Sequence, residues 1–362
     1  MLVLEIALRV VGYSEPVWYQ PDARLGWRLR PWLAAPHRQE GRSFVRVNAE
    51  GMRDREHIAD KEVDVYRIAV LGDAYAEARQ VEREQAFWAL LPAELAACGF
   101  RGSKRIEVLN FGIAGYGTAQ EYLMLESTAI RYQPDLVLLQ FANGDDVRNN
   151  SFALEPDKER PFFMSGRDGG LHLDESFNGS PGFRERSSFA AEVTRKLTDR
   201  SRLLQLAGSM GERSFIPQAR AAVDAESATL AAPRDALWED AWRVTEGLIA
   251  KTADFAQRNG ARFALVSVPA AIQVHPDPKL RAAAQERLGV PDLFYPERRV
   301  AGLAKRKGLL AVPLAAEMQP LAEKSGTYFH GFDGGKGRGH WNAAGHKAAA
   351  GIIARRLCAA GG

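Results

Sequence analysis

Five short runs rich in apolar and β-branched residues alternate with helical patterns along this 362-residue chain, and this alternation most limits how it can fold. The runs cover residues 66–73, 105–112, 134–144, 262–269 and 308–315. They are apolar almost throughout, which is typical of strands covered on both faces. Strands that alternate with helices build βαβ units around a parallel sheet. The sequence therefore predicts an α/β fold, a flavodoxin-like three-layer α/β/α sandwich whose central parallel sheet has about five strands.

Two segments break this alternation. Residues 12–60 are rich in Arg, Pro and aromatic residues, and we expect residues 1–60 to form an N-terminal addition. The main domain is predicted over residues 61–358, and the polar, Gly- and Pro-containing stretch 150–232 interrupts it. An insertion that follows the carboxyl end of a strand is well placed to line or cover a cleft, because open α/β sheets bind ligands there. A passive surface addition is the alternative.

Charge and motifs exclude several classes of protein. The net charge is only +3 and no run of Lys and Arg occurs, so we expect no nucleic-acid partner. Neither a P-loop, a GxGxxG fingerprint nor a GxSxG elbow is present, and we expect no cofactor. The spacing of His330, His340, His346 and Asp333 matches no familiar metal site, so no metal is expected either.

The N-terminal stretch MLVLEIALRVVGY is apolar but carries Glu5 and Arg9. It is too short to span a bilayer and lacks the basic region and cleavage site of a signal peptide. We interpret it as the remnant of a membrane anchor, with a tether N-terminal to the visible chain; an ordinary amphipathic helix is the alternative. Export or an inner-membrane tether is thus favoured over the cytoplasm, and the oligomeric state stays open. Cys98 and Cys358 have no metal-binding spacing, and we expect buried free thiols.

Four loops combine glycine with polar residues: GDAY at 72–75, NFGIAGYGT at 110–118, NGDD at 143–146 and GHWNAAGH at 339–346. The first three follow predicted strands. Because the carboxyl ends of parallel strands meet at one edge of a sheet, these loops are expected to converge there. The fourth opens the last helical pattern and is expected to close over the other three. The sequence therefore predicts one site built from all four loops.

These four ordered blocks resemble those of the SGNH/GDSL hydrolase family. The stretches YQPDARLGW and RVNAEGMRDRE also resemble the N-terminal region of membrane-tethered bacterial members. The resemblance implies that Ala74 occupies the position of the nucleophilic Ser and that His340 is the general base. It also implies an oxyanion hole formed by the backbone N–H of Ala74, by Gly115 and by Asp145.

The chain departs from the family pattern at three of these positions. Ala74 has no hydroxyl to deprotonate, so it cannot form an acyl-enzyme. Asp145 stands where the family has Asn, and an ionised carboxylate would repel a developing oxyanion. Gly337 stands where the family has the Asp that orients the base, and we expect Asp333 to replace it. A Ser-to-Ala exchange made to trap substrate explains Ala74 alone, whereas natural divergence explains all three departures.

The remaining pocket residues follow from the same loops. Asp73, Tyr75, Asp146 and Trp341 are expected to line the site, although Asp73 would cap the helix after its turn with or without catalysis. His346 lies within a helical pattern, and packing or capping is its expected role.

The resemblance implies an ester hydrolase or acyl transferase acting on O-acyl groups, such as acetyl, of a carbohydrate or small molecule. Because losing the Ser of such a triad costs on the order of 10⁶ in turnover, this chain is expected to hydrolyse esters very poorly. The alternative is a non-catalytic protein that binds an acylated glycan or a partner. A third reading is divergent acid–base chemistry by Asp73, Asp145, Asp146 and His340.

Overall fold

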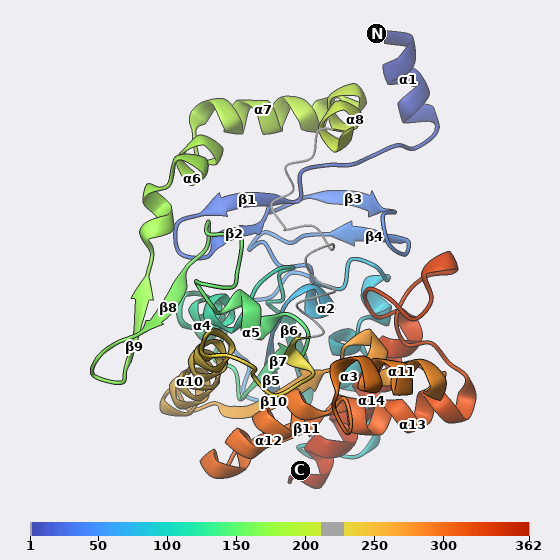
Figure 1. The fold of residues 1–362 in the computed structure, drawn as a ribbon. Coiled ribbons are helices and arrows are strands. Elements are labelled where there is room, and N and C mark those ends of the chain that lie inside the picture. The colour runs from blue at the N-terminus through green and yellow to red at the C-terminus, as the bar shows by residue number, and fades with distance from the viewer. Residues whose placement is uncertain (1, 211–227, 362) are drawn as a thin grey trace.

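The computed structural model describes residues 2–210 and 228–361 and is built around one parallel sheet (Figure 1). Its five strands lie in the order β11-β10-β7-β5-β6. Their bounds are β5 Val65–Leu71, β6 Arg105–Asn110, β7 Leu136–Ala142, β10 Arg262–Val268 and β11 Leu310–Pro313. Both faces carry helices, so every residue of β5 and β7 is buried. The predicted three-layer sandwich with a parallel five-stranded sheet is confirmed.

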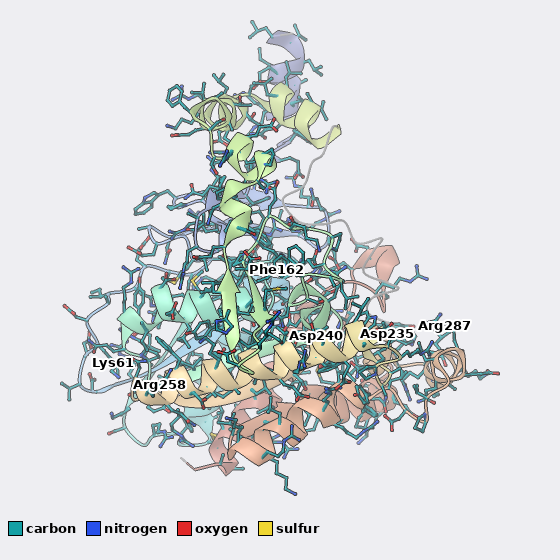
Figure 2. All side chains as sticks on the ribbon, turned by 60° about the vertical axis from the view of Figure 1, so that its left-hand side comes forward. Lys61, Phe162, Asp235, Asp240, Arg258 and Arg287 are labelled. Atoms are coloured by element: carbon teal, nitrogen blue, oxygen red, sulfur yellow. A yellow bond between two sulfur atoms is a disulfide. The ribbon has the colours of Figure 1, made fainter. Side chains whose placement is uncertain are left out.

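Each face of the sheet carries its own helical layer and apolar core. One layer consists of α3 Phe87–Ala97, α13 Leu314–Ser325 and α14 Ala343–Ala359. The other consists of α4 Thr118–Ser127, α10 Ala236–Arg258 and α12 Tyr295–Lys307. Figure 2 shows α10 crossing the molecule from near Asp235 to Arg258. Asp235 caps this helix by accepting the backbone N–H of Trp238, and the buried stripe of α10 includes Trp242 and Leu248.

The N-terminal residues form two antiparallel hairpins on the edge of the sheet where the strands end (Figure 1). They are β1 Tyr19–Asp22 with β2 Gly26–Leu29, and β3 Ala34–His37 with β4 Ser43–Arg46. A third hairpin pairs β8 Phe162–Ser165 with β9 Leu171–Asp174. The first two hairpins share the apolar core of the main domain through Trp27, Leu29 and Val45. This sharing means that the hairpins are positioned rigidly against the loops that follow the strands.

Further α-helices and 3₁₀ turns complete the described structure. The other α-helices are α1 Leu2–Val10, α2 Ala74–Glu77, α5 Asp146–Asn149, α6 Pro181–Arg186, α7 Phe189–Arg200, α8 Arg202–Met210 and α11 Pro278–Leu288. The 3₁₀ turns are Arg83–Gln85, Ala129–Tyr132, Ser176–Gly179, Ala271–Val274 and Asp333–Gly335. Within the described ranges, no helix combines the length and the apolar character needed to cross a bilayer. Part of the predicted 150–232 insertion, residues 211–227, lies outside the described residues.

Cys98 and Cys358 form a disulfide, so the expectation of free thiols was wrong. Cys98 directly follows α3 and Cys358 lies in the last turn of α14. The helical patterns around each cysteine predicted burial but said nothing about which helices would be neighbours. Because α3 and α14 pack side by side, the two Cα atoms lie 6.5 Å apart, within bridging range.

Reducing this disulfide is expected to destabilise the domain by about 5 kcal/mol, because the bridge closes a long loop between residues 260 positions apart. The measurement is urea unfolding with and without a reductant. The double variant Cys98→Ser/Cys358→Ser is the control and should unfold at one midpoint in both conditions. An unchanged midpoint of the natural chain on reduction would contradict the prediction.

Candidate active site

Ala74, which the sequence predicts at the position of a nucleophile, lies in the turn after β5. Ala74 is the first residue of α2 and is half-buried. Asp73 before it is buried, and its Oδ1 accepts the N–H of Tyr75 and the Nε2–H of Gln140, each at 2.9 Å. Burial raises the pKa of Asp73 to about 6. Asp73 therefore stabilises the turn from its buried side, while Ala74 and Tyr75 are only half-buried.

The loop after β6 is tied to this turn by buried hydrogen bonds. Glu77 accepts the N–H of Ala114 at 2.6 Å, and the N–H of Ile113 donates to Gly72 at 3.0 Å. Gly115 follows with φ +80°, a conformation that favours glycine. The Gly115 carbonyl accepts a hydrogen bond from Arg160, which belongs to the predicted insertion. Gly115 is thus held beside the Ala74 turn.

The loop after β7 carries two aspartates that are neighbours in the chain but differ in exposure. The Asp145 side chain is 37% exposed, and its Oδ1 lies 3.6 Å from Nη2 of Arg148. Asp146 is fully buried instead, and its Oδ2 accepts the N–H of Ala142 at 2.9 Å. The Asp146 side chain therefore points into the protein and closes its own turn. Asp145 is the carboxylate that solvent and a ligand can reach.

His340 is held by a residue that the sequence analysis missed. Its backbone N–H donates to Oε1 of Glu40 at 2.7 Å, and its Nδ1 lies 2.6 Å from Oε2 of the same carboxylate. Both side chains are about one-third exposed. Burial disfavours the imidazolium, but the hydrogen bond and charge of Glu40 outweigh it and raise the pKa of His340. Glu40 lies between β3 and β4, 300 residues from its partner.

Glu40, not Asp333, therefore orients His340. Asp333 is exposed and makes no side-chain hydrogen bond to His340 within the described part of the chain. Two glycines explain the arrangement. A Cβ at Gly337 would lie 2.7 Å from the ring of His275, and a Cβ at Gly339 would lie 2.2 Å from Oε1 of Glu40. An orienting Asp at position 337 has no room, whereas the missing side chain at 339 lets Glu40 approach.

Aromatic contacts bring His340 to the Ala74 turn. The ring of Tyr75, the residue after Ala74, lies 5.4 Å from the His340 ring and 5.0 Å from the Trp341 ring. Trp341 is 1% exposed and packs in the core against Tyr75. His346 is also buried, and its Nδ1 accepts the N–H of Phe87 at 3.2 Å. This contact is a structural role.

Buried carboxyl groups lie under the site. Burial raises the pKa of Glu121 and of Asp146 well above the usual range of carboxyl groups, and repulsion from Asp73 adds to both shifts. Both shifts favour the protonated form of these two carboxyl groups. Across the described ranges, no three His, Cys, Asp or Glu side chains are arranged to hold a metal ion.

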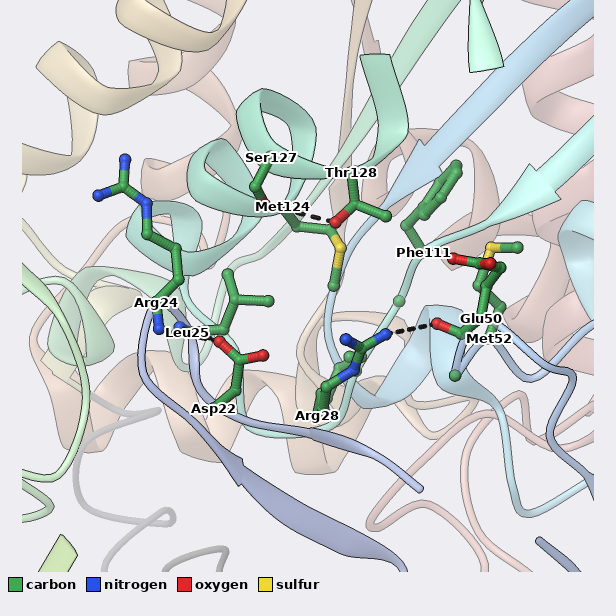
Figure 3. A pocket seen from close by; sticks show the side chains of 13 residues that line it. Asp22, Arg24, Leu25, Arg28, Glu50, Met52, Phe111, Met124, Ser127 and Thr128 are labelled. Carbon is green, nitrogen blue, oxygen red and sulfur yellow. Dashed lines mark hydrogen bonds between the residues drawn. The ribbon is translucent and has the colours of Figure 1, made fainter. Parts of the chain in front are cut away.

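A separate cavity of about 160 Å³ lies between the β1–β2 hairpin and the end of α4 (Figure 3). Met52, Phe111 and Met124 form apolar parts of its wall. Arg28 also lines it, and its Nη2 donates to the carbonyl of Glu50 at 2.6 Å. None of the predicted site residues lines this cavity.

Comparisons with known proteins give structural likenesses only. No family model matches the chain, and no curated protein does. Among solved structures, the acetyl xylan esterase AlAXEase is similar at 16% identity and TM-score 0.40, over 81% of this chain and 98% of that one. An acetylxylan esterase from Geobacillus stearothermophilus, crystallised as a catalytic mutant, is similar at 14% identity and TM-score 0.41, over 83% and 96%.

A GDSL-like lipase from Bacteroides thetaiotaomicron is similar at 14% identity and TM-score 0.38, over 84% of this chain and 93% of that one. Likenesses at this level assign neither a family nor an activity to the chain. Its function has to be argued from the site itself.

Proposed function

We propose that this chain carries an SGNH-type site for O-acyl esters, such as acetyl groups on a carbohydrate or small molecule, and that Ala74 leaves the site without its nucleophile. The observation that carries the proposal is the Glu40–His340 pair beside the Ala74–Tyr75 turn. A carboxylate on Nδ1 keeps that nitrogen protonated and leaves Nε2 of the ring as the proton acceptor. This is the arrangement of a general base that lacks only the hydroxyl on which it would act.

Two backbone groups support an oxyanion hole. The N–H groups of Ala74 and Gly115 donate to no acceptor among the described residues, and both residues are half-buried at the edge of the site. Unpaired donors at such positions are suited to the negative charge that develops on an acyl oxygen. The Asp145 carboxylate opposes this role, and its contact with Arg148 offsets part of its charge.

Covalent labelling of the Ala74→Ser variant tests the proposal. An organophosphonate is expected to modify residue 74 stoichiometrically, because Nε2 of His340 takes the serine proton while the oxygen attacks phosphorus and displaces the leaving group. Intact-mass analysis reads the adduct. The natural chain and Ala74→Ser/His340→Ala are the controls and should stay unlabelled. Absence of an adduct on Ala74→Ser would contradict the proposal.

Exchanging Asp145 for Asn in the Ala74→Ser background is expected to raise kcat by about 10²-fold, because an amide replaces a repelling carboxylate with a hydrogen-bond donor. The measurement is p-nitrophenyl acetate turnover. Asp157→Asn, on the loop before β8, is the control and should change kcat by less than about twofold. A loss of activity in Asp145→Asn would show that the carboxylate serves the reaction.

A second candidate function is binding without turnover. It is favoured by the combination of an intact Glu40–His340 pair with Ala74 in the same site. Calorimetry of the natural chain with an O-acetylated oligosaccharide and with its deacetylated form distinguishes the two candidates. Binding that requires the acetyl group, together with no rescue by Ala74→Ser, would favour the binding protein.

A further inference from the structure

Three helices at one end of the molecule carry much of its exposed apolar surface. They are α1, α7 and α8, which lie beyond the β1–β4 hairpins at the top of Figure 1, on the side away from the central sheet. Neither α1 nor α7 has a buried residue. Of the 19 large apolar side chains that are exposed among the described residues, nine lie on these three helices. Helices that bury nothing in their own domain contribute little to its core.

The apolar residues of α7 form a stripe that faces away from the body. Phe189, Val193 and Leu197 recur every four residues, so they share one side of the helix, and Phe189 is 80% exposed. The opposite side holds the partly exposed residues Arg195 and Asp199. Asp199 pairs with Arg30 at the end of β2, which fixes this opposite side against the hairpins. We call Phe189, Val193 and Leu197 the apical stripe.

Basic side chains flank the apical stripe. At 100° per residue, Lys196 and Arg200 fall on the same side of α7 as the stripe, and both are exposed, although Nζ of Lys196 lies 2.6 Å from Oε1 of Glu192 on the same helix. The neighbouring α1 adds exposed apolar residues, among them Val3 at 81%, and the exposed Arg9, which pairs with Glu5 at 2.7 Å. Glu5 accepts the backbone N–H groups of Arg202 and Leu203 at 3.0 Å, which docks α1 onto the start of α8. The three helices thus form one connected apolar and basic surface.

We propose that this surface binds an anionic lipid bilayer, with α7 lying in the interface and the apical stripe inserted among the acyl chains. An amphipathic helix with an apolar side, a polar side and adjoining Lys and Arg is the type of helix that lies in a membrane interface. The basic residues match the negative surface of anionic lipids, whereas a neutral groove partner would not require them. The bilayer would then sit on the far side of the β1–β4 hairpins from the central sheet. The proposal does not depend on the chemistry of the Ala74 site.

Vesicle flotation with the full chain tests this proposal. The chain is expected to float with vesicles of phosphatidylcholine and phosphatidylglycerol and to bind at least about tenfold more weakly to phosphatidylcholine alone or in high salt. Phe189→Asp/Leu197→Asp is expected to lower the partition coefficient by about tenfold or more. Both positions are exposed, so these changes should leave the thermal midpoint unaltered.

Matched controls test whether vesicle binding depends on this surface or on any exposed apolar or basic side chain. Ile58→Asp removes an apolar side chain that is 74% exposed elsewhere on the surface, and Lys104→Glu reverses an exposed charge before β6. Both should bind vesicles like the natural chain, whereas Lys196→Glu/Arg200→Glu should bind about tenfold more weakly. No flotation of the natural chain, or equal flotation of Phe189→Asp/Leu197→Asp, would overturn the proposal. A dimer in light scattering that this double variant abolishes would overturn it in favour of a second copy.

Discussion

Ala74→Ser is expected to raise kcat/KM for p-nitrophenyl acetate by about 10³-fold or more over the chain that carries Ala74. Removing the nucleophile of a Ser–His–carboxylate triad lowers turnover by on the order of 10⁶, and backbone donors and binding retain about 10³ to 10⁴ over water. Restoring the hydroxyl should recover a large part of that difference, because His340 and its orienting carboxylate are already in place. The recovery of kcat/KM is expected to be incomplete, because the Asp145 carboxylate remains beside the N–H groups of the proposed oxyanion hole.

The assay needs a control that carries the serine but not the base. Ala74→Ser/His340→Ala should return to the level of the natural chain, since the hydroxyl then has no proton acceptor. Circular dichroism checks that both variants fold. If Ala74→Ser stays at the level of the natural chain, or if its activity does not depend on His340, the proposed reaction is wrong.

Glu40→Gln in the Ala74→Ser background is expected to lower kcat by about 10²- to 10⁴-fold. The amide N–H₂ of glutamine would face Nδ1 of His340 and favour the tautomer that carries its proton on Nε2. His340 would then be unable to accept the serine proton. Turnover of p-nitrophenyl acetate is again the measurement, and Asp333→Asn is the matched control. Asp333 makes no hydrogen bond to His340, so its exchange should change kcat by less than about twofold.

The pH profile distinguishes an orienting role from a merely structural one. Glu40 raises the pKa of His340, and the base works only when it is neutral, so activity of Ala74→Ser should fall as the pH drops below that raised pKa. Without the carboxylate the imidazolium loses its partner and the pKa of His340 falls. The acid limb of the kcat/KM profile of Glu40→Ala should therefore move to lower pH. If the acid limb of Glu40→Ala stays in place, Glu40 does not set the pKa of His340. An equal loss of activity in Asp333→Asn would lead to the same conclusion.

The position of Glu40 also gives the N-terminal hairpins a role in the site. Glu40 sits between β3 and β4, and Arg53, just beyond β4, donates to the backbone carbonyls of Glu77, Ala78 and Val81 after the Ala74 turn. The hairpins therefore hold both His340, the proposed base, and the turn that would carry the nucleophile. Residues 1–60, which the sequence marks only as an addition to the domain, contribute directly to the site.

The sequence by itself determined the sheet and the place of the loops. Continuous apolar runs predict strands buried on both faces, and parallel strands bring the loops after β5, β6 and β7 to one edge for purely geometric reasons. The position of Ala74 and the absence of a hydroxyl there needed no structure. Both conclusions depend on local pattern and chain connectivity, which a sequence records directly.

Only the tertiary structure decided which distant residues meet. Glu40 lies 300 positions from His340 and Cys98 lies 260 positions from Cys358, and no local pattern carries information about either pair. The sequence did not show which side chains are buried either. Asp145 and Asp146 are neighbours in the chain, but solvent can reach Asp145, whereas Asp146 points into the core. Contacts between elements depend on how whole layers pack, and that packing is a property of the complete fold and not of any one segment.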